Sequence, residues 1–427
     1  MRGNFWKAAV SGGELGDNTR AFFQAITSIG TFYLVAKLLT ASTQILAGRW
    51  LGPSEYGLAN VVIAGSNLLA IPLQLGFAPA VSKFPAMETS QNSQADIVST
   101  AIWVNLLWVL PCVALLYWFE GYVSRILQLS AEVYLWSLAC SCLLTCYTLM
   151  CSALQGVRRF SQRGKVEVIY ASVFAATFAI SFWFFEFRYV ALVVSLLAAL
   201  FFSSLAAICY LRDWIRPVVS KQAVRSIKSY ALAPVINSIA MTLIMAATPI
   251  ILLSYMSPRE VGIYSAYNLG SVMIAGTLSG IVGTVVGPLS SLPLHNKNAW
   301  IRLFKSAPSV ILGGIAFFCG TSIVVLKLVG NGYPVELLWL LLFAGSAALS
   351  LVFSIALTLL YYRDESGLWL GVGGMVISGV VCLAGSLWAI PRAGISGAAL
   401  ALLTSYGIGL TWCAYWGWKE INHGYGS

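Results

Sequence analysis

Lys37 is the one Lys or Arg that lies well inside a long apolar segment. A lysine at the centre of a membrane helix costs about 3 kcal/mol on insertion scales, so it should face water or an anion. Gln44 follows seven residues later and falls on the same helical face. The alternative is a lysine that snorkels to the interface or bonds to carbonyls of a neighbouring helix. We favour a binding role because Lys37 lies too close to the centre to snorkel.

Polar side chains also recur with helical spacing in three later apolar segments. Asn60, Asn67 and Gln74 are seven residues apart, which is close to two turns and places them in one stripe. The other polar positions are Asn237 and Thr242, followed by Tyr264, Asn268 and Ser271. We expect the four segments to line one hydrated cleft. Hydrogen bonding between helices, worth about 0.6 kcal/mol per contact, is the alternative for any single residue.

A basic stretch, QGVRRFSQRGK at residues 155–165, could bind an anionic headgroup. Arg158 is the best candidate, because a later arginine, Arg363, repeats it. For each basic residue alone, however, retention on the cytoplasmic side of the membrane is the more common explanation.

No metal or cofactor site is expected. All nine cysteines lie in apolar stretches, and no His or acid stands near Cys140, Cys142 and Cys146 to complete a zinc site. Such cysteines act as small packing residues. The sequence predicts no catalytic residue.

The composition places these residues in a membrane protein. Hydrophobic residues make up 59% of the chain and charged residues 9%, whereas soluble proteins contain about 25% charged residues. The net charge of +10 comes from basic loops, which argues against nucleic-acid binding. Segments of about 20 apolar residues predict twelve transmembrane helices: 24–47, 58–82, 98–119, 133–154, 168–187, 190–211, 230–255, 262–287, 307–329, 335–360, 367–389 and 394–417.

The distribution of basic residues orients these helices. With a cytoplasmic N-terminus, eighteen Lys and Arg fall in inner segments and six in outer turns, a strong positive-inside bias. Both termini are therefore expected in the cytoplasm. The densest basic loops are 157–165 and 212–228. No connection is long enough for a soluble domain, so we expect a transporter and not an enzyme.

An internal repeat divides the chain. At a separation of 205 residues, Pro53, Glu55 and Gly57 align with Pro258, Glu260 and Gly262. The same separation pairs Arg158 with Arg363, and Lys37 with Thr242. Six helices return the chain to the same side, so the halves are parallel repeats with substrate expected between them. We predict lobes at 1–220 and 221–427.

Four stretches resemble the polysaccharide-transport family of lipid-linked oligosaccharide flippases, in the superfamily that includes multidrug exporters. They are ILAGRWLGPSEYGLANVV (45–62), ALQGVRRF (153–160), VVGPLSSL (285–292) and RAGISGAALALLTSY (392–406). The resemblance covers the whole chain in length and repeat, and its most specific element is 51–58.

The resemblance implies an all-α integral membrane protein with two six-helix lobes around a central cationic cavity. The implied substrate is an oligosaccharide repeat unit on undecaprenyl diphosphate, flipped outward across the inner membrane for O-antigen, capsule or exopolysaccharide synthesis. Basic residues of the first helices are expected in the cavity; Lys37 fits, and Arg49 lies at the outer end of the same helix. Further expected partners are membrane lipids, a polysaccharide polymerase and chain-length proteins.

Two other functions compete. An ion-coupled exporter of cationic drugs usually needs an Asp or Glu within the membrane, and the sequence shows none. This absence also weakens the case for proton coupling through a buried carboxylate. A polysaccharide-assembly enzyme of the membrane normally has a large catalytic outer loop, whereas the longest outer turn here is short.

Overall fold

The computed structural model describes residues 14–88, 90–184, 188–230, 232–280, 293–361 and 365–423. Within these ranges every regular element is helical, so the predicted all-α class is confirmed. The N-terminal half contains α2 (Glu14–Gln74), α3 (Phe77–Met87), α4 (Gln91–Trp118), α5 (Glu120–Leu127), α6 (Ala131–Gly156), α7 (Phe160–Phe184), α8 (Val190–Leu211) and η1 (Arg212–Trp214). After α9 (Lys221–Tyr230) come α10 (Leu232–Thr242), η2 (Leu243–Ala247), α11 (Thr248–Tyr255), α12 (Pro258–Asn268), η3 (Leu269–Met273), α14 (Pro293–Val329), α15 (Leu337–Tyr361) and α16 (Glu365–His423).

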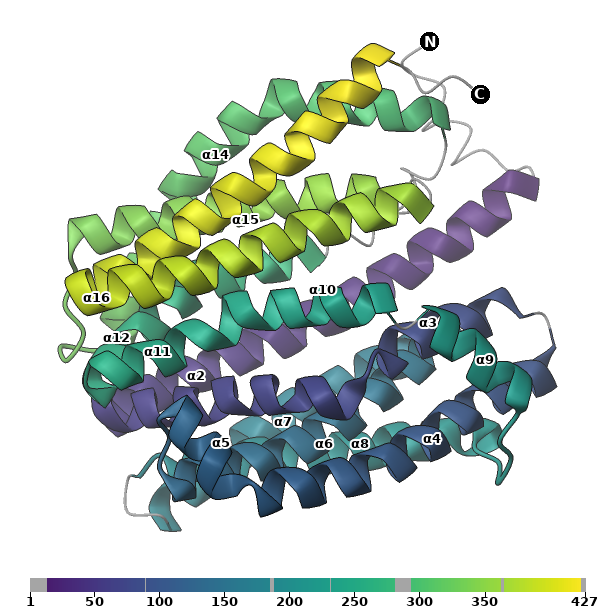
Figure 1. Ribbon diagram of the computed structural model, residues 1–427, viewed down its shortest axis with the longest axis horizontal. Helices are drawn as coiled ribbons and strands as arrows, with labels where there is room; N and C mark the ends of the chain where they lie inside the picture. Colours follow the sequence, from purple (N-terminus) through teal and green to yellow (C-terminus); the bar gives the residue numbers. More distant parts are fainter. Residues whose placement is uncertain are drawn as a thin grey trace.

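Nine helices in the described ranges are long and apolar enough to span a membrane. Two of them, Thr31–Gln74 and Ser366–Lys419, have 44 and 54 residues, far more than the roughly 20 that one crossing needs. Each contains a glycine with non-helical angles, Gly52 or Gly394, and Figure 1 shows both ribbons turning back. α2 and α16 therefore each hold two predicted segments. The count of twelve stays a prediction, because the segment 262–287 extends beyond the described residues.

Three predicted boundaries are wrong. The segment 58–82 is not one helix, because Leu75 and Gly76 adopt φ of 39° and 72° between α2 and α3. The basic stretch 155–165 is mostly helical, since α6 ends at Gly156 and α7 begins at Phe160. The basic loop 212–228 contains most of α9. Charged residues lower the local hydropathy at the start of α7 and in α9, and hydropathy alone cannot distinguish a polar helix from a loop.

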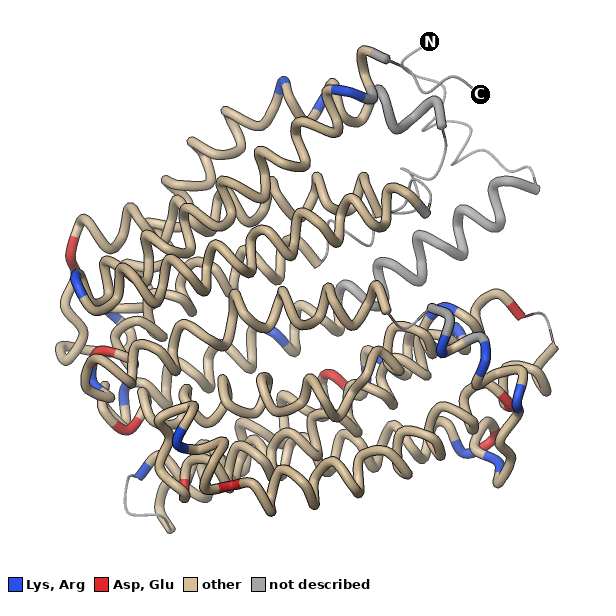
Figure 2. The backbone as a smooth tube through the Cα atoms, viewed as in Figure 1, with Lys and Arg blue, Asp and Glu red and all other residues tan. Residues whose placement is uncertain are grey.

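Figure 1 shows the helices in two groups that lie close together at one end and spread apart toward the other. We call the end with Gly52 and Gly394 the kink end, and the end with α9 the connector end. Figure 2 shows charged positions mostly at these two ends. Ile227 of α9 is buried in a cluster with Val98 and Leu211, so the connector packs on the N-terminal group. The lobe boundary at residue 220 remains a prediction.

The repeated Pro-x-Glu-x-Gly motifs meet each other at the kink end. A Cβ added to Gly57 would lie 1.9 Å from the carbonyl oxygen of Pro258, and one added to Gly262 would lie 1.9 Å from that of Pro53. Only glycine permits this reciprocal approach of α2 and α12. Prolines are well suited to the first turn of a helix, where a missing N–H costs nothing. The motif thus begins a helix and places a glycine at its crossing point.

The two motif glutamates have different contacts. Glu55 accepts a hydrogen bond from the backbone N–H of Tyr189, with 2.7 Å between nitrogen and Oε2. Glu260 instead forms a capping box with Ser257 at the start of α12. The first glutamate therefore ties α2 to α8, and the second stabilises its own helix.

Two π-helical turns, η2 and η3, interrupt the first two long helices of the C-terminal half. In η3, the carbonyl of Gly270 accepts a hydrogen bond of 2.6 Å from the Thr321 hydroxyl of α14. In η2, the carbonyl of Ile244 lies 3.9 Å from the Cys382 sulfur of α16. Such turns are frequent at functional sites. The repeat-related stretches of α2 are α-helical, so the halves differ here.

Candidate substrate cleft

A small pocket of about 80 Å³ lies between the two helix groups. We call it the interhalf pocket; its lining residues are Asn67, Ala70, Ile71, Gln74, Gly76, Pro79, Val235, Ser238 and Thr242. Among these described residues, four side chains from both halves can form hydrogen bonds, and none is charged. A water molecule takes up about 30 Å³ of liquid volume, so the pocket holds only a few waters unless the groups separate.

Asn67 and Gln74 reach the interhalf pocket together, as their predicted stripe requires. Asn67 is exposed and its amide donates only to its own helix, at the carbonyl of Ile63 (2.9 Å). The Gln74 amide also donates to the Thr148 hydroxyl of α6 at 3.2 Å. Gln74 therefore lines the pocket and links two helices. Asn60 is not among the lining residues, and its amide donates to the carbonyl of Tyr56 at 2.8 Å.

Lys37 is half-buried in α2, and its ammonium lies 4.9 Å from the centre of the Tyr33 ring. No ion pair to Lys37 is found within the described ranges. The hydroxyl of Tyr33 lies 3.9 Å from the position that a Cβ on Gly280 would take. The Lys37 region of α2 thus faces the C-terminal half. Two turns further along α2, the carbonyl oxygen of the Gln44 side chain is buried and has no hydrogen-bond partner among the described residues.

The other predicted site residues are dispersed. Asn237 accepts a hydrogen bond of 2.6 Å from the Tyr361 hydroxyl, so it links α10 to α15. Asn268 is half-buried at the end of α12, directly before the π turn. Arg49 is exposed near the kink end. These three do not join the interhalf pocket, and Arg363 lies outside the described residues.

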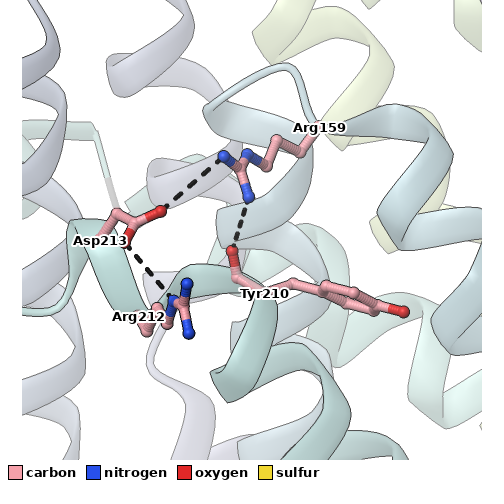
Figure 3. Close-up of polar contacts among 4 residues, drawn as sticks. All are labelled: Arg159, Tyr210, Arg212 and Asp213. Atoms are coloured by element: carbon pink, nitrogen blue, oxygen red, sulfur yellow. Dashed lines mark hydrogen bonds and ion pairs between the residues drawn. The ribbon is translucent and has the colours of Figure 1, made fainter.

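The basic residues after α6 are engaged with the protein itself. Arg158 has φ of 58° and donates to the carbonyl of Ala86 at 2.7 Å. Its neighbour Arg159 stacks on Trp214 at 4.2 Å and donates to the carbonyl of Tyr210 at 3.0 Å. Figure 3 shows Arg159 also pointing toward Asp213, 4.0 Å away. These arginines connect the ends of several helices.

One half-buried carboxylate was not singled out from the sequence. Glu167 lies two turns inside α7, its side chain is only 12% exposed, and it pairs with Arg163 at 4.0 Å. The prediction that no acid lies inside the membrane stays a prediction, because α7 begins eight residues before the predicted span and Glu167 lies in this added part. The signal was the i, i+4 spacing of Arg163 and Glu167, which marks a helix face. Ser238 was also missed, although it precedes Thr242 by one turn.

The family to which this chain belongs is shown by its match to a protein-family model. A family model described as polysaccharide biosynthesis protein matches residues 22–292, which is more than half of the chain. The chain belongs to this family. The resemblance inferred from its sequence is thereby confirmed. A search of curated proteins found no match.

Solved structures place this member of the polysaccharide biosynthesis protein family in a transporter fold. The inward-facing structure of a multidrug resistance MATE family transporter of the MOP superfamily has a TM-score of 0.66 at 14% identity, over 92% of this chain and 95% of that one. An outward-facing structure gives 0.64 at 13% identity, over 93% and 96%. The Vibrio cholerae MATE transporter VcmN in its bent form gives 0.58 at 12% identity, over 95% and 98%. The chain therefore shares the fold of these transporters, and the nine membrane-capable helices of its described residues agree with a multi-pass membrane protein.

Proposed function

We propose that this protein flips undecaprenyl-diphosphate-linked oligosaccharide repeat units from the cytoplasmic to the outer leaflet of the inner membrane. The product would supply O-antigen, capsule or exopolysaccharide synthesis. Family membership supports the polysaccharide context. The observation that supports a diphosphate cargo is Lys37, a half-buried cation in a membrane-capable helix. An aromatic ring lies beside it, and it has no ion pair with a carboxylate of the described residues.

Lys37 suits a phosphate-bearing cargo energetically. A cation inside the hydrocarbon region is expensive, by about 3 kcal/mol on insertion scales, unless an anion or water faces it. A diphosphate crossing between the halves carries the matching charge, and hydrogen bonds between charged groups are the strong ones. The arrangement lowers the cost of bringing a diphosphate between the helices.

The proposed orientation places the connector end in the cytoplasm and the kink end outside. The basic residues of α9 and of the α6–α7 turn then satisfy the positive-inside rule. In this orientation the membrane potential drives an anionic headgroup outward, by about 2.3 kcal/mol per charge per 100 mV. Alternating access would open the cleft first at the connector end and then at the kink end.

The proposal is tested by deleting the gene and complementing with Lys37 variants. Deletion should cause lipid-linked repeat units to accumulate on the cytoplasmic face, measured by lipid extraction and mass spectrometry. Lys37→Ala should slow flipping about 10- to 100-fold, equivalent to the roughly 1.5–3 kcal/mol of a hydrogen bond to a charged group. Lys37→Arg should retain more activity than Lys37→Ala. Full flipping by Lys37→Ala, with no advantage for Lys37→Arg, would show that Lys37 does not bind the diphosphate.

Export of cationic small molecules is the second candidate, because the fold is shared with multidrug resistance transporters. Against it, no carboxylate is among the described residues that line the interhalf pocket, and Glu167 is already paired with Arg163. An unchanged lipid pool in the deletion strain, together with altered drug resistance, would favour this candidate.

A further inference from the structure

The internal repeat relates the interhalf pocket to a second region between the halves, around Tyr33 and Lys37. At the separation of 205 residues, Ser238 and Thr242 of α10 correspond to Tyr33 and Lys37 of α2. Asn67 and Gln74 correspond in the same way to Val272 and Ser279. At the first place, the second long helix of the N-terminal half meets the first long helix of the C-terminal half. At the second place, the first long helix of the N-terminal half meets the second long helix of the C-terminal half.

One of these places is the interhalf pocket. Its polar members, Asn67, Gln74, Ser238 and Thr242, form what we call the neutral half-site. Together they offer two amides and two hydroxyls. None of the described residues that line this pocket is charged.

The other place differs in chemistry. Tyr33 and Lys37 of α2 lie there beside the helix that contains Gly280, as the 3.9 Å approach of the Tyr33 hydroxyl shows. Ser279 precedes Gly280, and its buried hydroxyl has no hydrogen-bond partner within the part of the chain that the structure describes. We call Tyr33 and Lys37, together with Ser279 at the position that the repeat relates to Gln74, the cationic half-site. One position of the repeat thus carries a cation in one half and a threonine in the other.

We infer that the neutral half-site binds the sugar hydroxyls of the cargo while the cationic half-site binds its diphosphate. The inference rests on the proposed function and assigns its two chemical parts to two places. Amides and hydroxyls both donate and accept, which matches sugar hydroxyls, and each such bond contributes about 0.5–1.5 kcal/mol. A phosphate would gain little from a site without a cation. The small volume of the pocket means that sugar binding requires the halves to separate.

Purified full-length protein in lipid nanodiscs tests this with two probes. One is undecaprenyl diphosphate without sugar, and the other is lipid-linked oligosaccharide extracted from the deletion strain. The double variant Asn67→Ala/Thr242→Val should bind the oligosaccharide lipid about tenfold more weakly, as expected for two lost neutral hydrogen bonds. Its affinity for undecaprenyl diphosphate should stay within about twofold of wild type, which is less than one such bond contributes. Lys37→Gln should weaken binding of both probes.

Thr404→Val is the matched control, because Thr404 is exposed on α16 and bonds only within its own helix. Ser238→Ala, a milder change in the same half-site, replaces the double variant should that variant unfold at a lower temperature than wild type. An equal loss for both probes, or no loss for either, overturns the inference while the proposed function stands. Wild-type protein that binds neither probe overturns the proposed function as well.

Discussion

Gly57 and Gly262 hold α2 and α12 at a distance that no other residue permits. Adding one methyl group to Gly57 places it 1.9 Å from a backbone oxygen, and backbone cannot rotate away as a side chain can. Gly57→Ala should therefore push the helices apart, at the 1–3 kcal/mol or so typical of overpacking. We expect a lower unfolding temperature in detergent. Gly262→Ala should do the same.

The control for this prediction is Gly320→Ala in α14, where an added Cβ meets nothing within 4 Å. Alanine is favoured over glycine inside a helix by about 0.5–1 kcal/mol, so this variant should be as stable as wild type or more stable. The double variant Gly57→Ala/Gly262→Ala should cost less than the sum of the single variants, because the first separation makes room for the second. Full additivity would show that the two glycines do not share one contact.

At the scale of elements, Arg159 connects the turn after α6 to the chain that leaves α8. Its exposed ion pair with Asp213 is worth about 0–1 kcal/mol, since the two side chains are 33% and 54% exposed. The stack on Trp214 and the bond to the Tyr210 carbonyl matter more. We expect Arg159→Gln to destabilise this junction by about 1–2 kcal/mol, the scale of a lost cation–π contact with one charged hydrogen bond.

Hydrogen–deuterium exchange measures this effect locally. Arg159→Gln should speed exchange in residues 212–220, whose backbone contacts α4 through Ser99 and Thr100. Arg212→Gln is the control, because Arg212 is 84% exposed and contacts the same Asp213. Equal acceleration in both variants would mean that charge, and not the stack, holds the junction.

The helices of this protein follow from its sequence more readily than their contacts do. Apolar length predicts a membrane helix wherever about 20 residues avoid water, so α4, α6 and α15 are predicted correctly apart from their ends. Around Glu167, hydropathy does not reveal the helix. Together with Arg163 and Lys165, Glu167 lowers the local hydropathy, and the first two turns of α7 look like a loop. A helix whose polar side chains face the protein interior is recognised only from its tertiary contacts and not from hydropathy.

In the candidate site too, the sequence predicts the helix face of a residue better than its contacts. Periodicity correctly places Asn67 and Gln74 on one face, because spacing fixes direction around a helix. It does not specify what that face meets, so neither Thr148 as the partner of Gln74 nor the position of Ser238 across the pocket follows from spacing. Asn60 has the correct spacing but lies too near the kink end to reach the pocket. How far along the cleft a residue lies depends on how the two halves cross, which spacing within one helix does not determine.

For the whole molecule, the contacts at the kink end close one side of the path between the halves. The Tyr333 hydroxyl donates to the carbonyl of Gly48 at 3.0 Å, which joins the α14–α15 connection to α2. Gly332 packs on Pro53 nearby. Figure 1 shows the groups spreading apart toward the connector end, where α9 lies. Outward release in the proposed cycle must therefore break the contacts at the kink end.

A disulfide across this closure should stop transport. A Cβ on Gly48 would lie 2.9 Å from Cγ1 of Val329, so cysteines at both positions bring their Cβ atoms within reach of the 3.5–4.5 Å or so of a disulfide. Replacing Val329 also removes the methyl groups that would clash with a side chain at 48. We expect Gly48→Cys/Val329→Cys to flip its lipid when reduced, to lose flipping on mild oxidation, and to recover with reductant. Each single variant should be unaffected by oxidation, which controls for the nine native cysteines, all of them free thiols. Fully cross-linked protein that still flips lipid at the reduced rate would show that the kink end need not open, and that the cargo leaves the helices by another route.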